Sequence, residues 1–90
     1  MDWSVKFSNT AIKQLKKIDK KWQVKILDFL EDEIGNADDP KIKGKVLTGD
    51  KKGFWRYRIG NYRVICDIRH SELVILALTI GHRKNVYKDK

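Results

Sequence analysis

Residues 54–68 read FWRYRIGNYRVICDI, and this stretch predicts a β-hairpin. Two runs rich in aromatic and β-branched residues flank the pair Gly60-Asn61, and glycine supplies the positive φ that the first central position of a two-residue turn requires. The turn sets the register, so Arg58 opposes Arg63. The other predicted pairs are Ile59 with Tyr62, Tyr57 with Val64, Arg56 with Ile65, and Trp55 with Cys66.

This register separates the side chains of the hairpin by chemistry, because opposed residues and residues two apart point to the same side of a sheet. Arg56, Arg58 and Arg63 fall on one side. The apolar side comprises Trp55, Tyr57, Ile59, Tyr62, Val64, Cys66 and Ile68. Opposed like charges destabilise a sheet by some tenths of a kcal/mol, so we expect the arginine side to bind a polyanion. The alternative is that Asp67, Glu72 or Asp50 neutralises it; Asp67 shares this side but lies toward Phe54, and one acid leaves a cationic surplus.

The charge of the chain is distributed unevenly along its 90 residues, which carry a formal net charge of +8. Residues 1–40 hold seven lysines, no arginine and eight acids, whereas residues 41–90 hold eight lysines, five arginines and four acids. Arginine grips phosphate in a planar, two-bonded fork. The clustered arginines therefore favour a phosphate-bearing partner over the alternative, a basic surface that serves only solubility.

The rest of the sequence predicts the elements that cover the apolar side. Residues 3–7 alternate as a half-buried strand; residues 11–18 follow one helical face after an N-cap at Ser8 or Asn9. A second helix starts after Asp19 and ends at Gly35, with an apolar stripe of Trp22, Ile26, Leu30 and Ile34. We expect these stripes to pack the core.

The remaining segments predict a loop and a last strand. Residues 35–53 read as a loop with a short extended piece at residues 45–47, and residues 73–80 form a nearly continuous apolar run typical of a central strand. A turn at His70-Ser71 would pair Arg69 with Glu72. We predict one α+β domain over residues 1–90: an antiparallel sheet of about four strands with an N-terminal helical hairpin on one face, in the order β-α-α-β-β-β.

Several classes of protein are not expected from this sequence. The longest apolar run is far shorter than the roughly 20 residues that a membrane span needs, and the first residues do not read as a signal peptide, so we expect a cytoplasmic protein. The single cysteine, Cys66, forbids an internal disulfide and suggests a buried thiol in a reducing compartment. Histidines and acids show no metal-ligand spacing, and we expect no cofactor.

If the partner is RNA, the chain offers groups for its cleavage. Arginines can stabilise the charge that grows on the phosphate, but a guanidinium stays protonated and cannot be the base. An ordinary imidazole suits either proton role, which makes His82 a candidate, and a phenol such as that of Tyr87 would suit one only if nearby cations lower its pKa. Spacing alone supports binding better than catalysis.

Residues 53–65 (GFWRYRIGNYRVI), the apolar run at 73–80 and residues 81–87 (GHRKNVY) resemble the RelE/ParE toxin superfamily, in particular its RelE-like branch; the Lys-rich helical segment IKQLKKI at residues 12–18 fits too. The resemblance covers nearly the whole chain. It implies the toxin of a type II toxin-antitoxin system, an endoribonuclease that cuts messenger RNA in the ribosomal A site without a metal, by attack of the 2′-hydroxyl. It also implies a cognate antitoxin, the ribosome with its ribosomal RNA, and messenger RNA as partners.

The resemblance also assigns residues. It implies catalytic roles for Arg56 and Arg58 before the turn, for Arg63 after it, and for Arg83 and Tyr87 beyond the last strand. Some relatives have lysines where this chain has Arg56 and Arg58, and one of those lysines is a candidate base. The base in this chain is therefore left as His82 or Tyr87. The basic residues predicted to contact RNA are Lys45, Lys51, Lys52 and Lys84. Two other functions stay open: a ParE-like poison of DNA gyrase without nuclease activity, and an inert relative that binds RNA or sequesters antitoxin.

Overall fold

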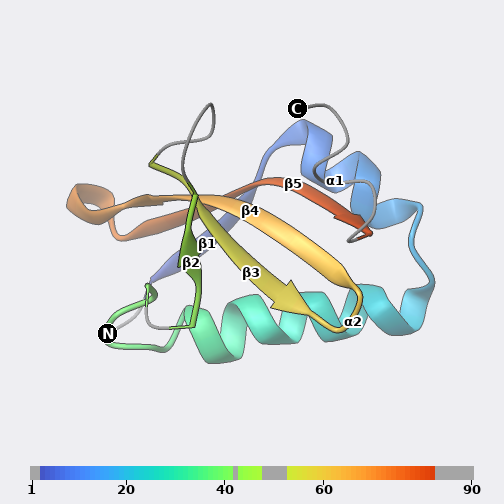
Figure 1. Ribbon diagram of the computed structural model, residues 1–90, viewed down its shortest axis with the longest axis horizontal. Helices are drawn as coiled ribbons and strands as arrows, with labels where there is room; N and C mark the ends of the chain where they lie inside the picture. The colour runs from blue at the N-terminus through green and yellow to red at the C-terminus, as the bar shows by residue number, and fades with distance from the viewer. Residues whose placement is uncertain (1–2, 42, 48–52, 83–90) are drawn as a thin grey trace.

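The computed structural model describes residues 3–41, 43–47 and 53–82. In chain order these residues form strand β1 (Ser4–Phe7), helix α1 (Asn9–Lys16), helix α2 (Lys20–Asp28), a π-helical segment η1 (Phe29–Ile34), and strands β2 (Lys45–Val46), β3 (Trp55–Ile59), β4 (Tyr62–Arg69) and β5 (Val74–His82), with a short 3-10 helix η3 (His70–Glu72) before β5. Figure 1 shows these elements along the chain. The predicted α+β class is confirmed, and the strands and helices follow the predicted order with β2 added.

The five strands form one sheet in the order β1-β5-β4-β3-β2. The pairs β2–β3, β3–β4 and β4–β5 are antiparallel, as predicted, and β5 lies between β1 and β4 as a central strand. The prediction differs in two respects: β2 is a fifth strand, and β1 pairs with β5 in parallel, Ser4 opposite Val74. Alternation of side chains does not encode strand direction, and the two helices after β1 form part of the long connection that a parallel pair requires.

Helix α1 is fixed to β5 by two polar side chains. Ser8 caps the helix, as predicted: its Oγ accepts a hydrogen bond from the backbone N of Ala11 at 3.0 Å and donates one to the carbonyl of Leu78 at 2.8 Å. Gln14 Oε1 accepts one from the backbone N of Ile80 at 2.6 Å. Strand β5 carries a bulge at this point, since its register against β4 shifts between Ile65 and Cys66. The two side chains therefore bond backbone groups where the ladder is irregular.

Helix α2 follows Asp19, as predicted, although the Asp19 side chain makes no capping hydrogen bond. It continues as η1, in which the N of Gly35 donates to the carbonyl of Leu30 at 2.8 Å. Apolar positions that recur every four residues drift by about 40° per step around an α-helix of 3.6 residues per turn. A wider π-helical turn opposes this drift, and Ile26, Leu30 and Ile34 are all 0% exposed.

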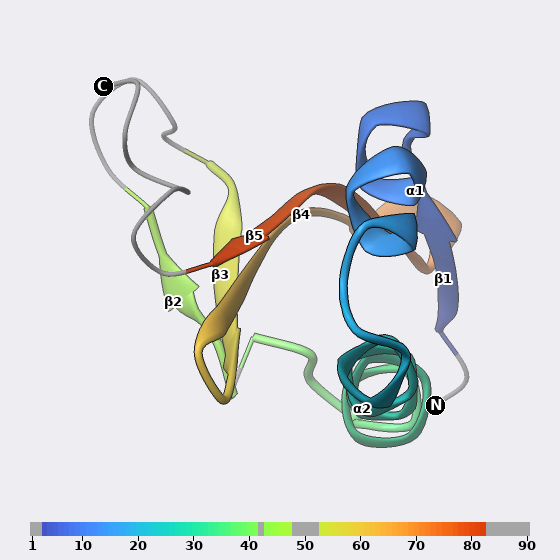
Figure 2. The ribbon, with the colours of Figure 1, turned by 90° about the vertical axis from the view of Figure 1, so that its right-hand side faces the viewer.

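The core lies between the helices and one side of the sheet, and Figure 2 shows the hairpin of β3 and β4 to one side and both helices to the other. Four of the seven residues predicted for the apolar side of the hairpin are buried: Tyr57, Ile59, Val64 and Cys66. The other three are half-buried. In the part of the chain that is described, no helix has both the length and the apolar character to span a bilayer.

Candidate nucleic-acid interface

The hairpin register predicted from the sequence is confirmed at every pair. Strands β3 and β4 pair Arg58 with Arg63, Arg56 with Ile65, and Trp55 with Cys66. The turn uses the predicted conformation, with φ of +60° at Gly60. Because cross-strand partners have Cβ atoms roughly 4.5 to 5.5 Å apart, the Arg58 and Arg63 side chains start as close neighbours on the side of the sheet opposite the helices.

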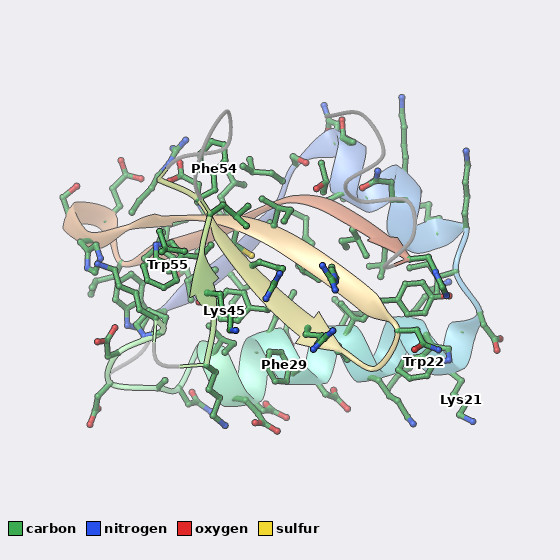
Figure 3. All side chains as sticks on the ribbon, viewed as in Figure 1. Lys21, Trp22, Phe29, Lys45, Phe54 and Trp55 are labelled. Carbon is green, nitrogen blue, oxygen red and sulfur yellow. The ribbon has the colours of Figure 1, made fainter. Side chains whose placement is uncertain are left out.

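Strand β2 extends this surface, because Lys45 pairs with Arg56. We call Lys45, Arg56, Arg58 and Arg63 the cationic sheet face. Figure 3 shows Lys45 on β2 beside the β3 strand. Three strands thus bring four cations onto one side: the three hairpin arginines, whose shared side the register predicted, and Lys45, which the sequence predicted only as a separate RNA contact. The sequence suggested an extended piece at residues 45–47, but only the sheet pairing brings Lys45 next to Arg56.

The four cations differ in exposure. Lys45 and Arg58 are exposed, whereas Arg56 and Arg63 are half-buried, and the Nε atom of Arg63 is shielded from solvent. Ile65 lies on the same side, between Arg56 of β3 and Thr79 of β5, and is 3% exposed. A guanidinium on partly covered stems is held in fewer orientations than one on a free stem, which favours the fixed fork that phosphate binding needs.

The predicted ion pair between Arg69 and Glu72 is wrong. The connection between β4 and β5 takes up residues 70–73, with Leu73 at φ 54°, so Arg69 pairs with Val74 and Glu72 lies within the turn. Arg69 Nε instead donates to Asp67 Oδ2 at 3.0 Å. The sequence signal favoured a two-residue turn at His70-Ser71, and it missed the left-handed residue that lengthens the turn.

Asp67, the acid that shares the arginine side by alternation, forms an ion pair with Arg69 on its own strand. Arg58 has no carboxylate within 4.0 Å among the residues that the structure describes. Acids concentrate elsewhere, in residues 28–39, where Glu33 pairs with Lys43 at 2.6 Å.

His82 does not lie on the cationic sheet face. It pairs with Tyr62 at the end of β5, and its ring meets the Tyr62 ring edge to face, with centroids 5.7 Å apart. Alternation along β5 puts His82 on the same side as buried Ile80, which is the side of the helices. The structure therefore brings Arg56, Arg58, Arg63 and Lys45 together but does not add His82 to them.

The other predicted site residues lie outside the described ranges. These are Arg83 and Tyr87, predicted as catalytic, and Lys51, Lys52 and Lys84, predicted to contact RNA. Their roles stay predictions. No group of three or more His, Cys, Asp or Glu residues that could hold a metal ion occurs within residues 3–41, 43–47 and 53–82.

The reverse side of the hairpin holds the cationic sheet face in place. Tyr57, between Arg56 and Arg58 in β3, is 0% exposed and donates a hydrogen bond from its hydroxyl to the carbonyl of Pro40 at 2.5 Å. Its ring packs edge to face on Phe29, with centroids 6.2 Å apart. Burial, followed by the nearby Cys66 and Asp39, raises the pKa of the Tyr57 phenol, and burial and Asp67 raise the pKa of the Cys66 thiol. Both groups are therefore neutral at physiological pH.

A helical layer on one side of a small sheet and a cluster of cations on the other define a class of compact basic α+β domains. The comparisons give this class a family: the profile described as "ParE toxin of type II toxin-antitoxin system, parDE" matches residues 5–87. The chain belongs to this family of type II toxin-antitoxin toxins.

Individual relatives agree with the RelE-like branch that the sequence predicted. Toxin RelG of Mycobacterium tuberculosis is 25% identical over 88 residues, which is 98% of this chain and 99% of RelG. Among solved structures, the toxin-antitoxin complex RelBE2 of M. tuberculosis has a chain with a TM-score of 0.85 and 24% identity, covering 94% of this chain and 95% of that one. The archaeal RelE-RelB complex of Pyrococcus horikoshii OT3 gives 0.72 and 28%, covering 96% and 100%.

Proposed function

We propose that this toxin is a ribosome-dependent endoribonuclease that cuts messenger RNA in the A site and so stops translation in the cytoplasm. The observation that carries the proposal is the placement of Arg56, Arg58, Arg63 and Lys45 on one side of the sheet. Four neighbouring cations suit the closely spaced phosphates of an RNA strand. When such a strand binds, its phosphates offset the repulsion between the cations.

The proposed reaction needs no metal. The 2′-oxygen of a ribose attacks the adjacent phosphorus, a P–O bond to the next nucleotide's 5′-oxygen breaks, and the products are a 2′,3′-cyclic phosphate and a free 5′-hydroxyl. One proton leaves the 2′-hydroxyl and one reaches the departing 5′-oxygen, so the charge peaks on the phosphate between them. Arg56, Arg58 and Arg63 stabilise that charge, because guanidinium donors are strongest against a developing anion.

The proton carriers belong to a different group, since arginine stays protonated. We assign the base to Tyr87 and a further phosphate contact to Arg83, by the resemblance to RelE-like toxins. The phenol has an ordinary pKa near 10, and a cluster of cations lowers the pKa of a nearby acid. His82 is not proposed as the base, because it faces Tyr62 on the helix side of β5.

The proposed partners follow from the charge and from the relatives. The structures of the RelBE2 and archaeal RelE-RelB complexes contain antitoxins, and we propose that a cognate antitoxin of the RelB type holds this toxin inactive. Lys51, Lys52 and Lys84 are proposed to contact messenger or ribosomal RNA. With a net charge of +8, association with the ribosome should weaken steeply as salt is added.

Primer extension on messenger RNA after induction of the toxin tests this function. Cuts at a fixed position within codons are expected. Replacement of Arg63 by alanine should abolish both the cuts and growth arrest while the protein still folds, and Arg83→Ala should do the same. The matched control is Arg69→Ala, since Arg69 lies on the same strand β4 but pairs with Asp67. Growth arrest that survives Arg63→Ala would refute the assignment.

A second function has one observation in its favour, because the matching family profile is named for ParE. A ParE-like toxin would poison DNA gyrase by binding the protein and would leave RNA intact. A supercoiling assay with purified gyrase separates the two: inhibition of supercoiling with intact message supports the gyrase poison, and codon-positioned cuts with normal supercoiling support the nuclease. Neither effect would indicate an inert relative.

A further inference from the structure

Three aromatic side chains form a continuous row at one end of the sheet. The ring centroids of Trp22 and Tyr62 are 5.5 Å apart, and those of Tyr62 and His82 are 5.7 Å apart. Trp22 comes from the first turn of α2, Tyr62 begins β4 and His82 ends β5. The aromatic row therefore joins the start of a helix to the ends of two strands, and all three side chains are half-buried.

This aromatic row lies directly behind the arginine pair of the cationic sheet face. Tyr62 is the residue before Arg63, and Tyr62 pairs with Ile59, the residue after Arg58. On β5, Gly81 pairs with Arg63 and His82 pairs with Tyr62. Consecutive residues of a strand point to opposite sides, so the rings support from the helix side the same strand ends that carry Arg58 and Arg63 on the other side.

The row is anchored at its helical end. A Cβ at Gly60 would come within 2.3 Å of Trp22, so the indole packs directly on the backbone of the hairpin turn, and Figure 3 shows Trp22 beside that turn. Lys25 Nζ lies 4.8 Å from the centre of the Trp22 ring on its own helix. Helix α2, the turn and the end of β5 thus form one packed unit, to which β5 contributes the ring of His82.

We propose that His82 is a positioning residue, whose ring holds the β4 and β5 strand ends and so orients Arg58 and Arg63 for the proposed RNA cleavage. The inference rests on the proposed function and deepens it, because it removes His82 from the proton transfer and gives it a defined task. An edge-to-face contact depends on the shape and polarisation of the rings. Phenylalanine can make the same contact without any group that carries a proton.

The experiment compares His82→Phe, His82→Ala and Tyr62→Ala in the full chain. Two quantities are measured for each: the amide hydrogen exchange of Arg58 and Arg63 by NMR, and the pH profile of message cleavage on ribosomes. We expect His82→Ala and Tyr62→Ala to speed exchange at these amides and to lower kcat, each roughly tenfold, the size of one lost aromatic contact. His82→Phe should restore both to within about threefold of the wild type, with an unchanged pH profile.

The matched control is His70→Ala. His70 also packs edge to face on an aromatic ring, that of Trp3, with centroids 5.4 Å apart, but it lies in the turn at the other end of β4. Its removal should alter neither the exchange at Arg58 and Arg63 nor kcat. Urea unfolding of each variant shows whether it folds, and His82→Leu replaces His82→Ala if the alanine variant does not.

Opposite results overturn the proposal. If His82→Phe is as inactive as His82→Ala, or loses one limb of the pH profile, His82 carries a proton. If His82→Ala changes neither exchange nor kcat, the ring has no positioning role. Should the wild-type protein cut no message at all, the proposed nuclease function fails by itself, and the exchange data alone decide whether His82 orders the arginine pair.

Discussion

The two sides of the β3–β4 hairpin differ sharply although they share a backbone. Tyr57 is 0% exposed, bonded to Pro40 and packed on Phe29, whereas its neighbour Arg58 is exposed and stands across from Arg63. The helix side stabilises the fold, and the other side places like charges together at some cost to stability. Adjacent residues should therefore separate folding from function.

The largest expected effect is on the helix side. Ile59 is 8% exposed in the core, so Ile59→Ala should lower the free energy of unfolding by about 3 kcal/mol through lost burial and a cavity. Urea denaturation followed by circular dichroism measures this. Val46→Ala is the control, since Val46 is 53% exposed on the β2 strand and should cost less than about 0.5 kcal/mol. A loss below about 1 kcal/mol at Ile59 would break the contrast between the sides.

The turn should give the next effect. Gly60→Ala puts a Cβ into a left-handed conformation, which costs about 1 to 2 kcal/mol, and it also forces the Trp22 ring to move. Gly53→Ala is the matched control: its φ is +93°, but a Cβ there meets nothing within 4 Å among the described residues. Gly60→Ala should therefore be the more destabilising, and the excess should disappear in a Trp22→Ala background. Equal losses at both glycines would contradict the packing of Trp22 on the turn.

Alkaline pH should lower the free energy of unfolding through two groups on the helix side, Cys66 and Tyr57. Cys66 and Tyr57 have pKa values raised above their ordinary 9.0 and 10.0 by burial, so above these values the unfolded chain loses protons that the folded chain retains. Their contribution to stability is complete below pH 9 and declines as the pH rises. Urea midpoints between pH 7 and pH 11 measure the decline, which should be shallower in Tyr57→Phe than in the wild type. An identical decline in that variant would exclude Tyr57 as a cause.

The smallest effect on folding belongs to the cationic sheet face. Arg58→Ala removes one of two opposed cations, so the free energy of unfolding should stay within about 0.5 kcal/mol of the wild type. RNA binding should nevertheless weaken, and the slope of log affinity against log salt should fall by roughly 0.7 for the lost phosphate contact. Fluorescence anisotropy over a salt series measures both. A stability loss above about 1 kcal/mol would mean that Arg58 supports the fold.

The hairpin could be predicted in full because its information is local. Gly60-Asn61 fixes the turn, the turn fixes the register, and alternation then assigns every side chain to a side of the sheet. The helices followed from apolar spacing in the same way, and the N-cap of the first helix was narrowed to Ser8 or Asn9, of which the structure has Ser8. The sequence alone therefore predicts that Arg56, Arg58 and Arg63 share one side of the sheet.

The features that the sequence did not predict depend on contacts between distant segments. The sequence around Val5 does not predict that β1 runs parallel to β5. The sequence around Leu78 does not predict the bulge in β5 where Ser8 and Gln14 bond to its backbone. The neighbour of His82 also could not be predicted locally. The residues around His82 indicate which way its side chain alternates along the strand, but only the pairing of β5 with β4 places it beside Tyr62. The left-handed Leu73 was missed because leucine carries no signal for that conformation.

The parallel contact between β1 and β5 has a consequence for biosynthesis. Strand β1 leaves the ribosome some 70 residues before its sheet partner β5, whereas the hairpin of β3 and β4 closes on a two-residue turn. Contacts between distant segments form slowly, because the intervening chain loses entropy when its ends meet. During its own translation, the nascent toxin therefore makes its hairpin early and completes its sheet last, when nearly all of the chain described here has emerged.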